Sequence, residues 1–340
     1  MVARYLIRAS VLIFLLCSMP AARADQIVLA NGDRLTGTVV SKSDETLKFR
    51  TEYAGEIEVR WKDVVSIATD APVTVLSPNG ELQTGKLEVT PAGETAFVSD
   101  GGSREITLAD IGHINPPPHV SGTGITYSGH VSLLGSASRG NTDDGRLYGE
   151  AEFKARAKEY RYRFFGRAEQ KEESGETTAQ NYFASAERDN VIDDDRFWYL
   201  RASVEHDEFK DIQLRAAAGG GLGIRLIDTS NTQFSVRGGL GYVLARRDVV
   251  PDETYPAFGW GIDYSHWFIP DRLEFFFNQG GLASLTSKGD VSMRTRTGVR
   301  FPISSGLSAN AQLNVDYEGD PGPDNEKTDT QLFVGLGYNF

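Results

Sequence analysis

Hydrophobic and polar positions alternate with period two in several strand-length segments after Tyr127. The clearest segments are 291–301 and 307–317, where every odd position is apolar or threonine and the even positions are mostly polar or charged. An α-helix repeats every 3.6 residues and does not produce this pattern. We therefore predict β-strands that have one apolar and one polar face.

About a dozen strands are expected in this region, which matches the even strand number of a membrane barrel. Short connectors at 158–159 and 270–271 alternate with longer, more acidic ones at 172–179, 246–254 and 318–327. Tight turns at one end and long loops at the other are typical of outer-membrane barrels. A soluble β-sandwich also alternates and is the other fold considered. The predicted strands are 126–138, 145–157, 160–171, 180–190, 196–207, 212–227, 232–245, 255–269, 272–285, 290–301, 305–317 and 328–340.

A duplicated unit precedes these strands. Asn31–Gly37 recurs about 48 positions later as Asn79–Gly85, and Lys62–Ile67 is echoed by Ala109–Ile114. Each copy, at 25–70 and 72–115, predicts a small, strongly bent β-module of the Sm-like or SH3-like kind. Such folds often bind peptides, oligonucleotides or glycans, but a spacer or dimerising module fits this sequence equally well because no catalytic cluster accompanies it. The triproline at 116–118 and the glycines that follow predict a linker over 116–124.

The first 24 residues are typical of a removable export signal. Arg4 and Arg8 supply positive charge, Val11–Leu16 form a short apolar core, and Ala22–Ala24 fit the small-x-small cleavage pattern. Cleavage there would remove Cys17, the single cysteine, so disulfides and thiolate sites are not expected in the mature chain.

Charge and hydropathy narrow the function classes. Lys and Arg number 35 against 47 Asp and Glu, which gives a formal net charge of −12. A net negative charge does not favour binding to the phosphate backbone of nucleic acids, so nucleic acid is not an expected partner. After the leader, no apolar run reaches the roughly 18 residues that a helical membrane span needs.

Catalytic and cofactor motifs are weak. The run Gly219–Gly223 misses the spacing of a dinucleotide loop, and Ser136–Gly140 lacks the first glycine of a nucleophile elbow. No cofactor and no metal site is predicted. A lipid hydrolase built on a barrel is the enzymatic alternative, with His206 as the candidate base.

The candidate functional residues are the charged side chains on the predicted inner face of the barrel. A tight turn at 158–159 places Glu150 opposite Arg167 and Arg156 opposite Arg161. A lumen of mixed charge fits either a narrow selective channel or a closed, salt-bridged interior. Three further arginines would favour anions in an open pore, namely Arg294, Arg296 and Arg300.

The last strand has an apolar face of Leu332, Val334, Leu336, Tyr338 and Phe340. It resembles the C-terminal signal by which the barrel-assembly machinery recognises bacterial outer-membrane proteins. That machinery is therefore an expected partner.

Three motifs resemble the outer-membrane family called domain of unknown function 481, which includes YdiY-like proteins described as salt-induced. They are Tyr127–Gly129, Gly140–Thr142 and Gly335–Phe340, and the resemblance covers roughly residues 120–340. It implies a barrel without implying a reaction.

We therefore expect an all-β protein of the outer membrane, with a barrel at 125–340 and its N-terminal modules in the periplasm. Its expected role is structural, binding or narrow-pore, and not enzymatic. Outer-membrane lipid and lipopolysaccharide are the expected surroundings of the barrel. Peptidoglycan or a periplasmic protein is a candidate partner for residues 25–115.

Overall fold

A computed structural model describes residues 24–340 except 44, 139–143, 230, 249–250, 288–289 and 322–325. The chain divides into two compact units between Pro117 and Pro118, within the predicted linker. That linker contains one short helical turn, α2 (Pro118–Ser121). The predicted export signal, apart from its last residue, and the Gly140–Thr142 motif lie outside the described residues.

The first unit repeats one order of elements twice. Its strands are β1 (Asp25–Leu29), β2 (Arg34–Ser43), β3 (Thr46–Thr51), β4 (Gly55–Arg60), β5 (Val64–Ala68), β6 (Val73–Leu76), β7 (Leu82–Val89), β8 (Thr95–Ser99), β9 (Gly102–Glu105) and β10 (His113–Ile114). A short 3₁₀ turn precedes β5 and β10 alike, η1 (Trp61–Asp63) and η2 (Leu108–Asp110). The element order therefore follows the duplication in the sequence.

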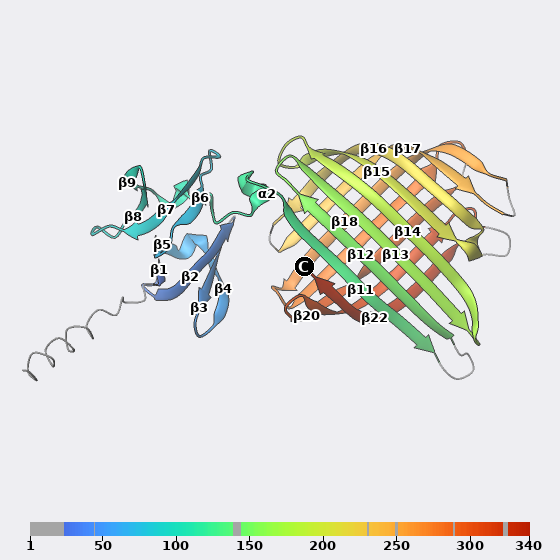
Figure 1. Ribbon diagram of the computed structural model, residues 1–340, viewed down its shortest axis with the longest axis horizontal. Coiled ribbons are helices and arrows are strands. Elements are labelled where there is room, and N and C mark those ends of the chain that lie inside the picture. Colours follow the sequence, from blue (N-terminus) through green and yellow to red (C-terminus); the bar gives the residue numbers. More distant parts are fainter. Residues whose placement is uncertain are drawn as a thin grey trace, which may run out of the picture. The chain divides into compact units, whose positions relative to one another are not determined.

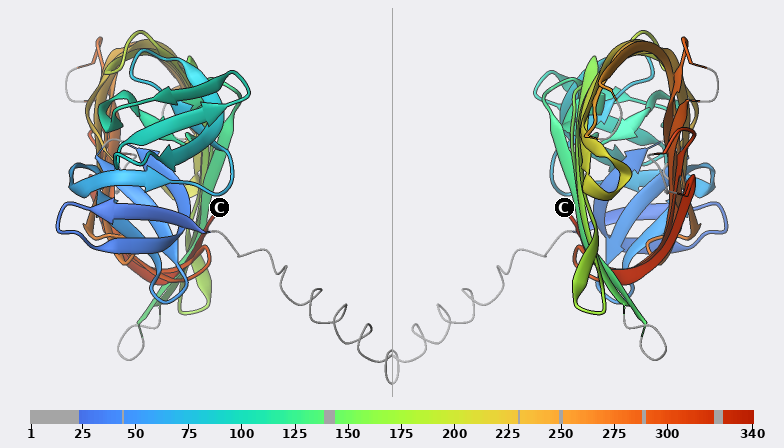
Figure 2. Two further views of the ribbon diagram at one scale, coloured as in Figure 1. Left: turned by 90° about the vertical axis from the view of Figure 1, so that its left-hand side faces the viewer. Right: turned by 90° about the vertical axis from the view of Figure 1, so that its right-hand side faces the viewer.

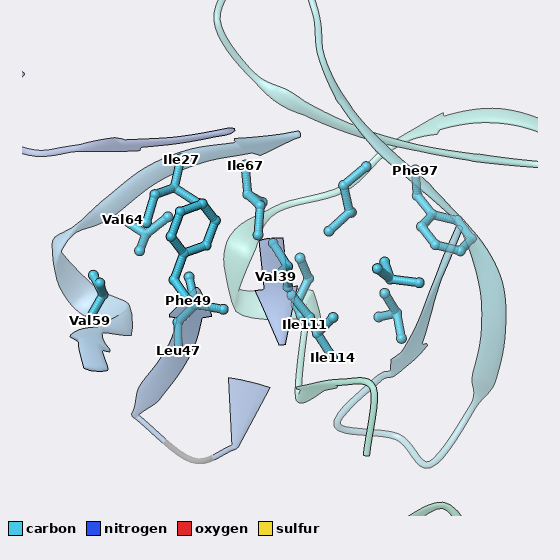
Figure 3. Close-up of a cluster of buried hydrophobic side chains, with 13 residues drawn as sticks. Ile27, Val39, Leu47, Phe49, Val59, Val64, Ile67, Phe97, Ile111 and Ile114 are labelled. Atoms are coloured by element: carbon cyan, nitrogen blue, oxygen red, sulfur yellow. The ribbon is translucent and has the colours of Figure 1, made fainter. Parts of the chain in front are cut away.

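The two copies share one hydrophobic core. Strand β10 of the second copy pairs with β2 of the first as well as with β6. Ile27, Phe49 and Ile67 of the first copy belong to the same buried cluster as Leu87 and Phe97 of the second (Figure 3). A half of this size buries little apolar surface alone, so joining the halves gives each a larger core.

The second unit is a closed antiparallel barrel of twelve strands, in which each strand pairs with the next and β22 pairs with β11 (Figures 1 and 2). The strands are β11 (Thr126–Ser138), β12 (Asp144–Arg156), β13 (Tyr160–Glu173), β14 (Glu176–Val191), β15 (Arg196–Asp207), β16 (Ile212–Asp228), β17 (Thr232–Arg246), β18 (Glu253–Ile269), β19 (Leu273–Ser284), β20 (Val291–Ser304), β21 (Leu307–Glu318) and β22 (Thr328–Asn339). The barrel predicted from alternation is thereby confirmed, and the sandwich is excluded.

One connector differs from its predicted length. The expected long loop at 172–179 is a tight hairpin, because β13 and β14 continue on either side of Ser174 and Gly175. Both turn residues have positive φ, 53° and 87°. This is the geometry of a type I′ turn, whose twist matches the twist of the two strands.

The outer face of the barrel is mainly apolar, and most of its buried charged residues face the interior. On β22, for example, Leu332 is 65% exposed, whereas Glu150, Arg215 and Glu205 on other strands are almost fully buried. A soluble fold has the opposite distribution. Among the described residues, no helix is long and apolar enough to cross a membrane.

Candidate functional site in the barrel lumen

The β12–β13 register places Glu150 directly opposite Arg167, as the short turn predicts. The two side chains nevertheless find their partners on distant strands. Glu150 accepts a hydrogen bond from Arg296 of β20 at 2.6 Å, and Arg167 donates to Asp316 of β21 at 2.8 Å. In a closed barrel, such pairs form only if the side chains reach across the interior.

Further ion pairs bridge the lumen in the same way. Arg215 of β16 lies 2.8 Å from Glu318 of β21, and Arg294 of β20 contacts Glu205 of β15. Charge-assisted hydrogen bonds are among the stronger polar interactions, and a carboxylate left without its partner in such a site is costly. The interior is therefore braced between opposite walls.

Four side chains inside the barrel form a closed ring of alternating charge. Arg163 lies 2.5 Å from Glu187 and 3.3 Å from Asp263. Arg237 lies 3.2 Å from the same Glu187 and 2.6 Å from the same Asp263. Each carboxylate thus holds two guanidinium groups, and strands β13, β14, β17 and β18 are tied together.

The three arginines of β20 all face inward and are all paired. Arg294 contacts Glu205, Arg296 lies 2.6 Å from Glu150, and Arg300 lies 3.0 Å from Glu274. Inward phenylalanine rings also lie beneath them, with Arg296 4.2 Å from the ring centre of Phe165. Their positive charge is therefore matched locally, which weakens the simple expectation that they form an anion-attracting row.

Arg156 and Arg161 face each other near the short-turn end, and each finds an acidic partner elsewhere. Arg161 donates from Nε to Asp189 at 2.9 Å, whereas Arg156 lies 3.5 Å from Asp228 and is partly exposed. The apparent like-charge pair in the register is therefore neutralised by carboxylates from other strands.

A cavity of about 170 Å³ lies beside the charge ring. Arg201 of β15 lines it together with Tyr199 and Ser203, which occupy neighbouring inward positions on the same strand. Arg201 is not among the candidate lumen charges predicted from the sequence. Alternation places it inside, but only the pairing of distant strands decides which arginines obtain a carboxylate.

On the adjoining strands β16 to β19, glycines occupy several of the inward positions that line the cavity. Gly219 and Gly241 are cross-strand neighbours on β16 and β17, as are Gly239 and Gly259 on β17 and β18, and Gly280 of β19 also lines the cavity. Glycine in a strand interior leaves space where another side chain would fill it. These glycines account for the open volume, and none belongs to a nucleotide-binding loop.

The five residues proposed as an assembly signal share the outer face of β22 and its end. All are more than half exposed, from Tyr338 at 51% to Leu332 at 65%, with Val334, Leu336 and Phe340 between them. Other outward aromatic side chains touch one another near the short-turn end, including Tyr160 with Tyr162 and Phe234 with Tyr264. This arrangement is an aromatic girdle of the kind found at a membrane surface.

The histidine of the hydrolase alternative lacks a catalytic arrangement in the described part of the chain. His206 lies on the outer face, where Nδ1 is 2.8 Å from the Gln213 carbonyl oxygen and the ring stacks on Tyr182. Its sequence neighbours Glu205 and Asp207 are buried on the opposite, inner face. His206 therefore has neither a hydroxyl partner nor an orienting carboxylate there.

No group of metal-ligating side chains occurs within the residues that the structure describes. Neither the lumen carboxylates nor the charge ring gathers three such groups around one point, because arginines separate them.

The solved structures that resemble this chain include porins and an autotransporter domain. No curated protein matches the chain. Among solved structures, the NanC porin aligns at 9% identity and TM-score 0.41, over 62% of this chain and 98% of that one. The KdgM porin aligns at 10% identity and TM-score 0.35, over 62% and 99%. The translocator domain of the autotransporter NalP from Neisseria meningitidis aligns at 13% identity and TM-score 0.33, over 64% and 89%.

A protein-family model also matches the barrel. Residues 131–340, which include nearly all of the barrel, match the model described as "Protein of unknown function, DUF481". This agrees with the resemblance found in the sequence. The chain belongs to the DUF481 family.

Proposed function

We propose that this protein is an outer-membrane barrel that acts as a narrow pore for small solutes. The observation that carries the proposal is the lumen, in which ion pairs join opposite walls and leave a cavity of about 170 Å³. Twelve strands enclose a limited interior, so side chains that cross it restrict passage strongly. The apolar outside and the aromatic girdle support a bilayer as the surroundings, with outer-membrane lipid and lipopolysaccharide as its components.

Planar-bilayer conductance tests the pore. Wild-type protein is expected to give small, discrete current steps. The double variant Arg163→Ser/Asp263→Ser removes two members of the charge ring together and is expected to raise the step size. Absence of current from both proteins would overturn the pore and leave a closed, structural barrel.

Location is tested on isolated outer membranes. A folded barrel is expected to migrate as a compact band in SDS until it is boiled, and to fractionate with the outer membrane. Recovery as a soluble protein without a heat shift would contradict the proposal. Recognition of the β22 outer face by the assembly machinery stays a prediction of the sequence.

We also propose that residues 25–115 contact peptidoglycan or a periplasmic protein. The support is a compact unit with its own core that leaves large side chains exposed, among them Tyr53 at 96% and Val65 at 54%. Full-length protein is expected to sediment with purified peptidoglycan, whereas a chain that lacks residues 25–115 is not. Equal sedimentation of both chains would contradict a peptidoglycan contact.

A further inference from the structure

Arg201 forms no ion pair with a described residue, although the Glu187 carboxylate lies opposite it in the strand register and attracts it from a distance. The register of β14 and β15 pairs Arg201 with Glu187. Glu187, however, accepts from Arg163 at 2.5 Å and lies 3.2 Å from Arg237. Within the described residues, Arg201 is the one inward arginine that has neither an ion pair nor a hydrogen bond. Its cross-strand neighbour on the other side is Gly219, which offers no side chain.

The charges around Arg201 balance without it. The connected ion pairs here contain three carboxylates and three cations, namely Glu152, Glu187, Asp263, Lys154, Arg163 and Arg237. Arg201 therefore adds one uncompensated positive charge at the cavity wall. A guanidinium away from bulk water gains much from an anion, above all from a carboxylate that accepts two parallel hydrogen bonds.

Hydroxyl groups accompany this charge. Tyr199 and Ser203 occupy the inward positions on either side of Arg201 along β15, and Ser185 lies directly opposite Ser203 on β14. All three line the cavity, and none of their hydroxyls has a hydrogen-bond partner among the described residues. Free hydroxyls can donate to or accept from a hydroxyl group of a ligand.

We infer that the cavity is a binding site for a small hydroxylated carboxylate. Arg201 would hold the carboxylate, and the serine and tyrosine hydroxyls would contact the hydroxyl-bearing part. The volume of about 170 Å³ corresponds to roughly five or six water molecules. The site deepens the proposed pore, because a binding step in the lumen selects which solute passes, but the binding itself can be measured without conduction.

The glycine wall supplies a test that leaves the charge in place. A Cβ built at Gly280 would lie 3.8 Å from Arg201 Nη1 and 3.6 Å from the Trp260 carbonyl oxygen, which is ordinary contact. Gly280→Val should therefore fold and place its methyl groups in the cavity beside the guanidinium. Arg201→Gln removes the cation, and Arg201→Lys keeps it without the two-pronged geometry.

The experiment is saturation-transfer NMR on full-length protein in zwitterionic micelles. The probes are lactate, its neutral analogue lactamide, and propionate, which lacks the hydroxyl group. Lactate is expected to bind wild type, propionate more weakly and lactamide not detectably. Arg201→Gln and Gly280→Val are each expected to weaken lactate binding at least tenfold, whereas Arg201→Lys weakens it less than Arg201→Gln.

Arg188→Gln is the matched control, because Arg188 is an arginine on the outer face that lies against Tyr160 and Tyr162. Its lactate binding should equal that of wild type. Equal lactate binding by wild type and Arg201→Gln, equal binding of lactate and lactamide, or no binding by wild type would each overturn the site. Conductance of the same preparations separates the two proposals, because a protein that conducts without binding lactate would refute only the site.

Discussion

Gly129 and Phe340 join the two ends of the barrel sheet. The Gly129 amide donates to the Phe340 carbonyl oxygen at 2.9 Å, and the Phe340 amide donates to the Gly129 carbonyl oxygen at 3.1 Å. The Phe340 ring lies over the glycine, where a Cβ would come within 2.1 Å of the ring. The Phe340 ring thus occupies the space that a side chain at position 129 would fill.

Replacing Gly129 by valine should weaken this seam. The new side chain would displace the Phe340 ring, and overpacking of this kind costs about 1–3 kcal/mol. The compact SDS band should therefore be lost after heating to a lower temperature than for wild type. Gly149→Val is the control, because an added Cβ there meets nothing closer than 3.9 Å. The double variant Gly129→Val/Phe340→Ala should recover part of the loss, and an absence of recovery would show that the ring is not the cause.

The charge ring should contribute strongly to barrel stability. Glu187→Gln leaves Arg237 with Asp263 alone and Arg163 with Asp263 and the more distant Glu152. Breaking a buried ion pair from one side costs about 3–5 kcal/mol. The urea midpoint of refolded protein in micelles should fall accordingly. Glu172→Gln, at an exposed position near the end of β13, is the comparison and should change the midpoint little. Equal midpoints for both variants would contradict a stabilising ring.

Lys42 should hold the two halves of the N-terminal unit together. Its buried Nζ donates to the carbonyl oxygens of Ile111 at 2.8 Å and Gly112 at 2.5 Å. Lys42→Met removes both hydrogen bonds and leaves the two carbonyl oxygens without a donor. Unsatisfied buried carbonyls lower the free energy of unfolding by about 1–3 kcal/mol. Limited proteolysis of full-length protein should cut this unit faster. The control is Lys48→Met, because the Lys48 ammonium lies at the surface, 3.7 Å from Glu58. This variant should be cut as slowly as wild type. Wild-type resistance of Lys42→Met would refute the prediction.

The short turn between β14 and β15 should respond to acid. Hydrogen bonds from the Arg196 side chain and then from its backbone amide hold the pKa of Asp193 below its ordinary value. A lowered pKa means that the charged carboxylate stabilises the folded turn above the unfolded value, which is about 3.9. This contribution is lost as the pH falls through the lower folded value. The amide resonance of Arg196 should therefore titrate below about pH 4 in wild type. It should not titrate in Asp193→Asn, and persistence of the titration there would assign it to another group.

Arg188 should anchor the outer face of the barrel. Its guanidinium lies 5.9 Å from the Tyr160 ring centre and 5.6 Å from that of Tyr162. Arg188→Gln should lower stability by about 1 kcal/mol through the lost cation–π contacts. Arg188→Lys should keep part of this contribution. Thermal unfolding in micelles measures both, and a larger loss for lysine than for glutamine would contradict the explanation.

Alternation and connector length predicted the barrel closely. The predicted ranges 126–138 and 196–207 are those of β11 and β15, because side-chain direction in a strand repeats every two residues and can be counted in the sequence. The duplication likewise predicted the order of elements before the barrel. Its merger into one core was not evident, since burial between two copies depends on how their strands pair.

The sequence by itself therefore determined which side chains of the barrel face inward and which strands are neighbours. Only the closed tertiary structure decided which inward charges meet, because Arg163 and Asp263 lie 100 positions apart and on strands that do not pair. In the closed barrel, Glu187 forms ion pairs with Arg163 and Arg237, and its register partner Arg201 forms none. Local periodicity sets direction, whereas contact across a lumen depends on the curvature and closure of the whole sheet.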